Sequence, residues 1–235
     1  MHYTIQQLAQ LIDHTNLYAA ASKQDIEKLC DEAVKYQFKM VAINEYQTHL
    51  CAMKLAQSKV HVGAAISFPL GQTDLKSKLF SAQQALNAGA DEIDYVVNLS
   101  AVKNKDYAYV ADEMQQMVKL CHHQQAICKV IFENCYLKKE EISTLAKIAK
   151  NVKPDFIKTS TGFGISGATI EDVKLMKQVV GHEVNVKAAG GIRDAATFIK
   201  MIQAGATRIG TSSGIKIIEE LQQKMRLAAI SELEI

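Results

Sequence analysis

The feature of the sequence that most constrains its fold is an alternation, repeated eight times, between short β-branched runs and longer amphipathic stretches. The β-branched runs predict strands, and the amphipathic stretches predict helices. Strand starts recur at intervals of roughly 30 residues, which is the length of a βα unit in a parallel sheet. The predicted strands are Leu11–Thr15, Lys39–Ile43, His61–Phe68, Glu92–Asn98, Ala126–Glu133, Asp155–Thr159, Glu183–Ala188 and Arg208–Thr211.

Helical patterns fill the spaces between these strands, and one short helix precedes them all. A last helix is expected to open at Ser212-Ser213. The other predicted helices are Thr4–Leu11, Lys23–Gln37, Asp74–Ala88, Tyr107–His123, Lys139–Lys150, Ile170–Val180 and Ala195–Ala204.

Two folds are compatible with this alternation: an open, doubly wound parallel sheet and a closed barrel. Eight evenly spaced units favour the closed (β/α)8 TIM barrel, and 235 residues suit a compact barrel, which usually needs about 250. Only two prolines occur, and no Gly/Ser/Pro-rich linker interrupts the pattern. We therefore predict one α/β domain over residues 1–235, a TIM barrel with a short N-terminal helix.

Composition limits the partners and the compartment. The net charge is +2 with no basic block, so nucleic acid is not an expected partner. No apolar run approaches the roughly 18 residues of a membrane span, and the N-terminus lacks the pattern of a secretory signal. Five cysteines without a CxxC spacing are typical of reduced thiols. We expect a cytoplasmic protein.

Charged residues interrupt four of the predicted strands, although strands of a parallel barrel are covered on both faces and should be apolar. Side chains alternate across a strand, so each charge lies opposite its apolar neighbours and points into the barrel. A buried ion-pair network would satisfy any one of them. Several such charges near the C-terminal ends of neighbouring strands, where barrel active sites lie, indicate a functional site instead. These residues are Asp94, Lys129, Lys158 and Lys187.

The two lysines on neighbouring strands, Lys158 and Lys187, indicate carbonyl chemistry. A lysine amine is nucleophilic only when it is neutral, and its reference pKa is about 10.4. Burial and a second ammonium nearby both disfavour the charged form. One lysine could therefore form a Schiff base while the other lowers its pKa.

Glycine-rich loops follow the last three predicted strands, at 159–164, 188–193 and 210–214. Glycine lets backbone N–H groups approach an anion closely, and hydroxyl groups add donors. In TIM barrels the loops after the last two strands often bind phosphate. The same loops could also serve only as tight turns and helix caps.

These segments together resemble deoxyribose-phosphate aldolase, a class I aldolase family, over nearly the whole chain. The most specific segments are Lys158-Thr-Ser-Thr-Gly-Phe-Gly164 and Val186-Lys-Ala-Ala-Gly-Gly-Ile-Arg193. The other matching segments are Ile12-Asp-His-Thr15, Ile66-Ser-Phe-Pro-Leu-Gly71, Ala90-Asp-Glu-Ile-Asp94, Lys129-Val-Ile-Phe-Glu133 and Arg208-Ile-Gly-Thr-Ser-Ser213.

The resemblance implies reversible cleavage of 2-deoxy-D-ribose 5-phosphate to acetaldehyde and D-glyceraldehyde 3-phosphate, without metal or other cofactor, in an enzyme that forms a homodimer. It assigns the imine to Lys158, perturbation of its pKa to Lys187, and proton transfer with a water to Asp94. Asp13, Thr15 and Lys129 would line the polar pocket. The phosphorylated substrate would contact Thr161, Gly162, Gly190, Gly191, Gly210, Ser212 and Ser213.

The chain departs from the family pattern in two places. Ala42 occupies a position where many relatives have cysteine, and the chain ends in Glu232-Leu-Glu-Ile235 where some relatives end in a tyrosine that assists proton transfer. Two alternatives stay open from the sequence. One is another Schiff-base sugar-phosphate aldolase or transaldolase, and the other is a catalytically silent barrel that senses a phosphorylated sugar.

Overall fold

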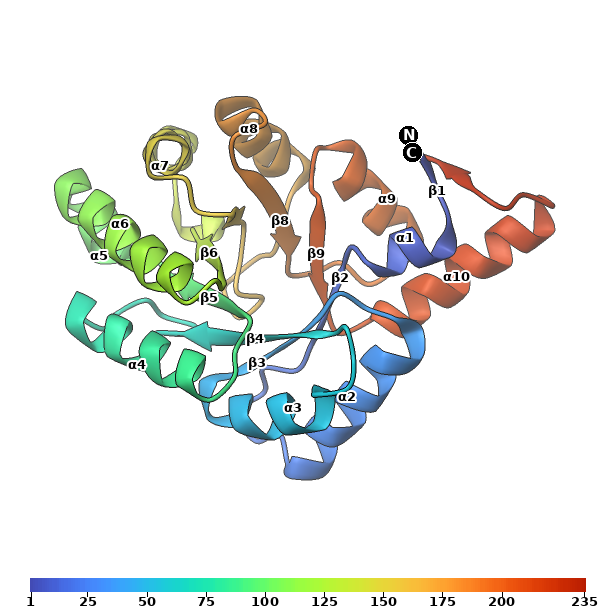
Figure 1. Ribbon diagram of the computed structural model, residues 1–235. Coiled ribbons are helices and arrows are strands. Elements are labelled where there is room, and N and C mark those ends of the chain that lie inside the picture. The colour runs from blue at the N-terminus through green and yellow to red at the C-terminus, as the bar shows by residue number, and fades with distance from the viewer.

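Eight parallel strands form a closed barrel in the computed structural model, which describes residues 1–235. Each strand pairs with the next one along the chain, and the last returns to the first. The helices lie around the outside of the strands (Figure 1). The predicted (β/α)8 TIM barrel is confirmed. Its strands are β2 (Ile12–Thr15), β3 (Met40–Asn44), β4 (His61–Ile66), β5 (Glu92–Val96), β6 (Ile127–Ile131), β7 (Phe156–Lys158), β8 (Asn185–Ala189) and β9 (Arg208–Thr211).

The predicted helices begin close to their expected positions, where polar residues cap them, whereas the helices Thr48–Leu55 and Leu99–Lys103 were not predicted. Ser22, Asp74, Thr169 and Asp194, for example, each accept a hydrogen bond from a backbone N–H of the first helical turn. The helices are α1 (Ile5–Ala9), α2 (Lys23–Tyr36), α3 (Thr48–Leu55), α4 (Leu75–Asn87), α5 (Leu99–Lys103), α6 (Tyr107–His123), α7 (Lys139–Val152), α8 (Ile170–Val180), α9 (Ala195–Gln203) and α10 (Gly214–Leu227), with the short 3₁₀ turns Glu45–Gln47 and Asn134–Tyr136.

A small antiparallel sheet joins the two ends of the chain, and the sequence pattern did not predict it. β1 (His2–Tyr3) pairs with β10 (Leu233–Glu234), and the amino group of Met1 donates to the carbonyl oxygen of Ile235 at 2.7 Å. The two ends therefore lie side by side beyond the barrel (Figure 1). Strands of two residues carry too few side chains for a period-2 pattern to be recognised.

The barrel divides the buried side chains into two populations because neighbouring residues of a strand face opposite ways. The outward-facing set, including Tyr95, Val130, Ile157 and Val186, belongs to a cluster of 54 buried hydrophobic residues between strands and helices. The inward-facing set contains the charged residues that the sequence singled out. The predicted division of these strands into an apolar outer face and a charged inner face is confirmed.

Gly63 of β4 leaves room in the inner layer for a neighbouring side chain. A Cβ atom built on Gly63 would lie 2.3 Å from the sulfur atom of Met40 on the neighbouring strand β3. The Met40 sulfur in turn lies 3.5 Å from Nζ of Lys129. Gly63 thus gives Met40 the space in which its thioether packs against a buried lysine.

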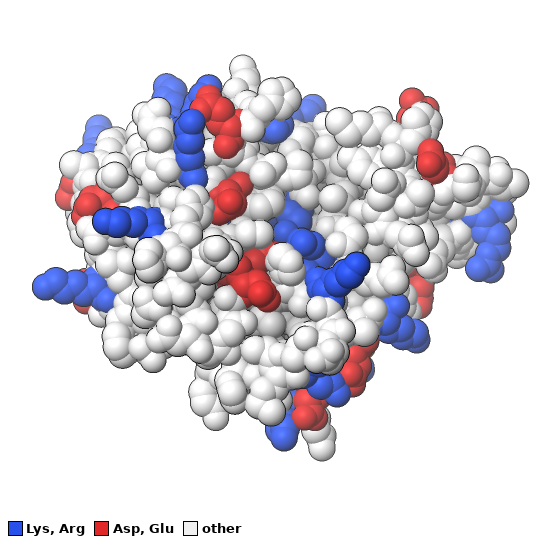
Figure 2. Space-filling model, in the orientation of Figure 1, with Lys and Arg blue, Asp and Glu red and all other residues white.

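Charged side chains of both signs are scattered over the face shown in Figure 2, without a large area of one sign. No helix combines the length and the apolar composition that crossing a membrane requires.

A second buried charge pair lies outside the barrel, between α4 and α6. Lys78 and Glu113 are both fully buried, and their charged atoms lie 2.6 Å apart. Lys78 also donates to the carbonyl oxygen of Val96, and Glu113 accepts from the N–H of Asn98. Every charged atom of the pair has a partner, which is what makes the burial of two charges tolerable.

We predict that Glu113→Gln lowers the free energy of unfolding by about 3–5 kcal/mol, because it leaves the Lys78 ammonium buried without a counter-charge. Urea denaturation measures this loss. The matched control is Glu27→Gln, which breaks the exposed pair of Glu27 with Lys23 and should change stability by less than about 0.5 kcal/mol. Equal losses in the two variants would contradict the argument.

Candidate active site

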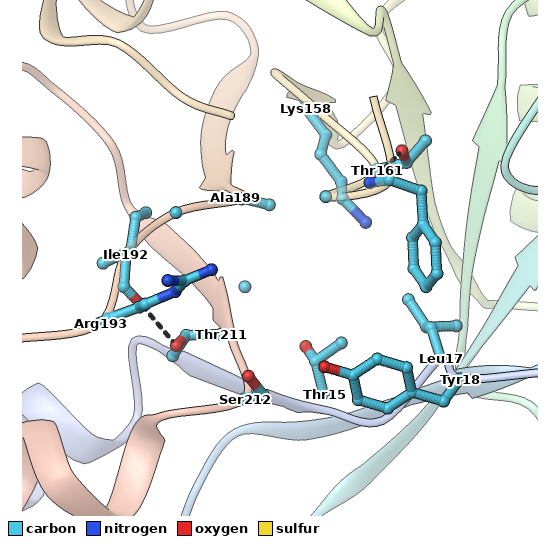
Figure 3. A pocket seen from close by; sticks show the side chains of 15 residues that line it. Thr15, Leu17, Tyr18, Lys158, Thr161, Ala189, Ile192, Arg193, Thr211 and Ser212 are labelled. Carbon is cyan, nitrogen blue, oxygen red and sulfur yellow. Dashed lines mark hydrogen bonds between the residues drawn. The ribbon is translucent and has the colours of Figure 1, made fainter. Parts of the chain in front are cut away.

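A cavity of about 260 Å³ opens at the end of the barrel to which the strands point with their carboxyl ends. This is the end where TIM barrels bind their substrates. Lys158 reaches into the cavity from one side, with Arg193 and Ser212 on the opposite side (Figure 3). The lining residues are Thr15, Leu17, Tyr18, Lys158, Thr161, Gly162, Phe163, Ala189, Gly190, Gly191, Ile192, Arg193, Gly210, Thr211 and Ser212.

The structure brings together the three residues that the sequence marked as catalytic. Lys158 ends β7 and lies beside Lys187 of β8 in the strand register. Both amines donate to the same oxygen, Oδ2 of Asp94, at 2.8 Å from Lys158 and 2.7 Å from Lys187. Of the three, only Lys158 lines the cavity, and Lys187 and Asp94 lie directly behind it.

The surroundings of Lys158 favour the neutral form of its amine. Burial lowers its pKa to about 8, and the nearby ammonium of Lys187 acts in the same direction, while the Asp94 carboxylate opposes both. An amine with a pKa of about 8 is neutral in about a tenth of the molecules at pH 7. Lys158 therefore meets the electronic requirement for a nucleophilic amine.

Asp94 stays ionised despite its burial. Burial raises its pKa, but Lys129, Lys158 and Lys187 together outweigh this effect and hold the pKa well below its usual range. Lys129 of β6 donates to the other oxygen, Oδ1, at 2.6 Å. Burial alone would lower the pKa of Lys129, but Asp94 and Glu92 raise it above its usual value, so Lys129 remains an ammonium.

Asp13 and Thr15 of β2 differ in their relation to the cavity. Thr15 lines it, and its hydroxyl donates to the carbonyl oxygen of Asp13 at 2.8 Å. Asp13 is fully buried below the cavity, where Oδ2 lies 2.5 Å from Nζ of Lys187. Asp13 and Lys129 are thus neighbours of the lysine cluster, and they do not line the cavity.

The loop after β7 is fixed from below by a buried carboxylate. Glu133 accepts a hydrogen bond from the N–H of Thr161 at 3.1 Å, and a second one from the Thr161 hydroxyl. Burial raises the pKa of Glu133, while its hydrogen bonds with Thr161 act in the opposite direction. The hydroxyl of Thr161 also accepts from the N–H of Phe163. Thr161 and Gly162 both line the cavity.

Two glycine loops meet backbone to backbone beside Lys158. A Cβ atom on Gly190 would lie 2.9 Å from the Cα atom of Gly167 and 3.3 Å from that of Gly162, and Gly190 has φ +85°. Only glycine combines this backbone conformation with such a close approach. The absence of side chains leaves the backbone at 190–191 facing the cavity, where N–H groups can meet an anion.

The last loop lies across the cavity from Lys158. Gly210 and Ser212 line the cavity, as the sequence suggested for a phosphate site. Ser213 does not line it; its N–H donates to the hydroxyl of Thr211 at 2.9 Å. The Thr211 hydroxyl in turn donates to the carbonyl oxygen of Ile192 at 2.7 Å, which ties this loop to the preceding one (Figure 3).

Seven of the fifteen lining residues were not predicted: Leu17, Tyr18, Phe163, Ala189, Ile192, Arg193 and Thr211. Arg193 supplies the one guanidinium among the lining residues, and it ends the Gly-Gly-Ile-Arg segment that the sequence analysis quoted, so a search for phosphate-binding cations in that segment could have found it. Leu17, Tyr18 and Phe163 form an apolar side of the cavity. The rings of Tyr18 and Phe163 lie 6.3 Å apart in an edge-to-face arrangement. They come from loops, where no hydrophobic periodicity marks them.

No group of three or more His, Cys, Asp or Glu side chains is placed to hold a metal ion. His14, which adjoins Asp13 in sequence, faces outward and forms a hydrogen bond with Glu32 of α2 at 2.8 Å. The site brings together a buried amine, a carboxylate shared with a second lysine, and a glycine-rich wall.

Comparison with known proteins places the chain in a family. Residues 7–220 match the family model described as DeoC/LacD family aldolase. The deoxyribose-phosphate aldolase of Lactobacillus acidophilus is 57% identical over 235 residues, covering 100% of this chain and 99% of the relative.

Two solved structures share the fold at substantial sequence identity. The structure titled "QR15, an Aldolase" has a TM-score of 0.88 and 40% identity, covering 94% of this chain and 98% of that chain. A tetrameric deoxyribose phosphate aldolase from Aeropyrum pernix has a TM-score of 0.87 and 32% identity, covering 94% of this chain and 93% of that chain. The chain belongs to the DeoC/LacD aldolase family.

Proposed function

We propose that this protein is a class I aldolase that reversibly cleaves 2-deoxy-D-ribose 5-phosphate to acetaldehyde and D-glyceraldehyde 3-phosphate through an imine on Lys158. The observation that carries the proposal is the position of Lys158. It is the only lysine among the cavity-lining residues, and burial lowers its pKa to about 8. The names of the relatives supply the substrate, since several are deoxyribose-phosphate aldolases.

The reaction needs only an amine and groups that move protons. The neutral amine of Lys158 attacks the aldehyde carbon of the open-chain sugar, and loss of water gives the imine. Removal of the proton from the hydroxyl on C3 breaks the C2–C3 bond, and its electron pair moves toward the imine nitrogen. Glyceraldehyde 3-phosphate leaves, C2 of the remaining enamine takes up a proton, and water releases acetaldehyde and the free amine. No redox step occurs, so no cofactor is required.

Asp94 and Lys187 are the residues we assign to proton transfer. Asp94 Oδ2 accepts hydrogen bonds from both Lys158 and Lys187, so a proton can pass between the two amines through one carboxylate oxygen. Lys187 also disfavours the ammonium form of Lys158. Thr15 at the cavity wall can bind a substrate hydroxyl, and Asp13 supports the amine of Lys187 from below.

The far wall of the cavity suits the phosphate group. We assign the phosphate to backbone N–H groups at Gly190 and Gly191 and to the segment Gly210–Ser212, with Arg193 as the balancing cation. Thr161 and Gly162 would contact the sugar between this wall and Lys158. Lys129 and Ser213 would act indirectly, Lys129 through Asp94 and Ser213 through Thr211.

Two further properties complete the proposal. All five cysteines are free, which supports a reducing, cytoplasmic location. We also propose that two copies form a homodimer, as the family resemblance implies; the related aldolase from Aeropyrum pernix, a tetramer, supports self-association but not this particular number of copies.

We predict that borohydride reduction in the presence of acetaldehyde adds a two-carbon group to Lys158 and inactivates the enzyme. Mass mapping of peptides identifies the modified residue. Labelling should become faster as pH rises through about 8, because the fraction of neutral Lys158 amine increases over that range. Lys129 is the internal control, since its pKa is raised and it should stay unlabelled.

Label on Lys187 or Lys129 in place of Lys158 would overturn the assignment of the nucleophile. Acetaldehyde release from 2-deoxyribose 5-phosphate tests the substrate. An enzyme that traps aldehydes on Lys158 but releases no acetaldehyde would be a Schiff-base enzyme with a different donor.

For the phosphate site, we predict that Ser212→Asp raises KM for 2-deoxyribose 5-phosphate at least about tenfold and changes turnover of unphosphorylated deoxyribose by less than twofold. The new carboxylate would repel the phosphate in a site built from anion donors. Ser231→Asp, on the exposed surface near the C-terminus, is the matched control and should leave both substrates unaffected. Equal losses on both substrates would show that the phosphate binds elsewhere.

For the oligomeric state, we predict that light scattering after size-exclusion chromatography gives about 52 kDa, twice the 25.9 kDa mass of the chain. A mass that stays at one chain over a hundredfold range of concentration would rule out the homodimer.

A further inference from the structure

The charges inside the barrel form a closed ring below the candidate active site. Three carboxylates and three cations alternate around it. Its six members are Glu92, Lys129, Asp94, Lys187, Asp13 and Arg208, and each contacts the one before and the one after, with Arg208 returning to Glu92.

The contacts within the ring are short, and all six residues are buried. Lys129 bridges Glu92 and Asp94, and Lys187 bridges Asp94 and Asp13. Arg208 closes the ring: its Nε donates to Asp13 at 2.7 Å, and Nη2 donates to Glu92 at 3.2 Å. No member is more than 5% exposed. Each cation thus has two carboxylate partners, and the ring as a whole is electrically neutral.

Lys158 is the seventh charge and stands outside the ring. Its only salt-bridge partner is Asp94, at 2.8 Å, and Asp94 already serves two ring lysines. The cluster of seven therefore carries one net positive charge when Lys158 is an ammonium, and none when Lys158 is a neutral amine. Because the residues of the cluster are buried, the neutral cluster is favoured.

We infer that Glu92 and Arg208, at the opposite end of the barrel from the cavity, are positioning residues that set the proton affinity of Lys158 through the charge balance of this ring. The inference rests on the proposed role of Lys158 as nucleophile. Neither residue lines the cavity, and both lie at the first position of their strands. They act through Lys129, Asp94, Asp13 and Lys187.

The groups around the two residues support this role. Arg208 faces Asp13 of β2 and Glu92 of β5, and its guanidinium lies 5.6 Å from the centre of the Phe156 ring of β7. Glu92 faces Lys129 of β6 and Arg208 of β9. On its third side, His61 of β4 donates from Nδ1 to Glu92 at 2.7 Å.

His61 connects the ring to Lys39. Nζ of Lys39 lies 3.2 Å from Nε2 of His61, so the ammonium can donate to that nitrogen while Nδ1 donates to Glu92. The remaining carboxylate near Lys158, Glu133, is engaged by Thr161 and forms no salt bridge with Lys158.

The charge balance of the ring predicts whether each substitution raises or lowers the pKa of Lys158. Arg208→Gln removes a cation, so the ring becomes negative and holds the Lys158 proton more firmly; its pKa should rise. Glu92→Gln removes a carboxylate, so the ring becomes positive, or Lys129 releases a proton to restore neutrality; the pKa of Lys158 should fall or stay unchanged. The double variant is neutral again and should return the pKa toward that of the unaltered protein. A loss of packing alone would not raise the pKa of Lys158 in Arg208→Gln and restore it when Glu92→Gln is added.

The test measures the titration of Lys158 by reductive methylation with formaldehyde and cyanoborohydride, followed by peptide mass mapping from pH 6 to 10. This reaction requires a neutral amine and no aldol cleavage, so it is independent of the proposed substrate. For Arg208→Gln we expect the midpoint to rise by about one pH unit, which means roughly tenfold slower labelling at pH 7. For the Glu92→Gln/Arg208→Gln variant we expect a return to within about 0.3 unit of the original midpoint.

Arg208→Lys is the conservative control, because it keeps the charge and should keep the midpoint. An unmoved midpoint in folded Arg208→Gln, or an upward shift in both Arg208→Gln and Glu92→Gln, would overturn the inference. If Arg208→Gln does not fold, Asp13→Asn tests the same balance by removing a carboxylate; its midpoint should fall, or stay unchanged if Lys187 releases a proton, and a rise would overturn the inference. If the midpoints shift as expected but no acetaldehyde is released from 2-deoxyribose 5-phosphate, only the proposed substrate fails.

Discussion

A charge taken out of water has to be paired or neutralised, and this constraint shapes the inside of the barrel. Most TIM barrels fill this space with layers of branched apolar side chains. Here the middle of the barrel holds acids and bases that satisfy one another, with Met40, Ala42 and Ala189 completing the packing. The strand register places the two lysines Lys158 and Lys187 side by side and Asp94 beside Lys129, and Asp94 forms salt bridges with all three lysines. The reactive lysine is the one for which this pairing is incomplete.

The fold and the centre of the site could be predicted because both follow from strong local rules. Eight βα units leave a clear periodicity, and a lysine in a buried strand conflicts with its surroundings unless it has a partner. The same reasoning missed Lys78 and Glu113, although they are as deeply buried as the barrel lysines. Both lie on amphipathic helices, where a charged residue is ordinary, so nothing local indicated that these two faces meet.

The cavity walls were predicted less completely than the lysine cluster. Glycines at 190 and 210 are informative because their loops allow close backbone contact, and they do line the cavity. Which serine of the pair Ser212-Ser213 faces the cavity depends on how α10 begins, and one residue of helix rotation decides it. Tyr18 and Phe163 approach each other only because the loops after β2 and β7 converge above the barrel. Contacts of this kind depend on the three-dimensional course of loops, which sequence periodicity does not encode.

Each of the three cations of the ring is bridged by two carboxylates, and this limits how far these side chains can move during turnover. A group held from two sides by strands of a closed barrel has little freedom to reorient when a neighbouring charge appears or disappears. Proton exchange at Lys158 then changes the electric field without requiring water or side chains to rearrange, so the reorganisation energy of each proton step should be small. The charged side chains inside the barrel are thus already oriented before the substrate binds, which is electrostatic preorganisation.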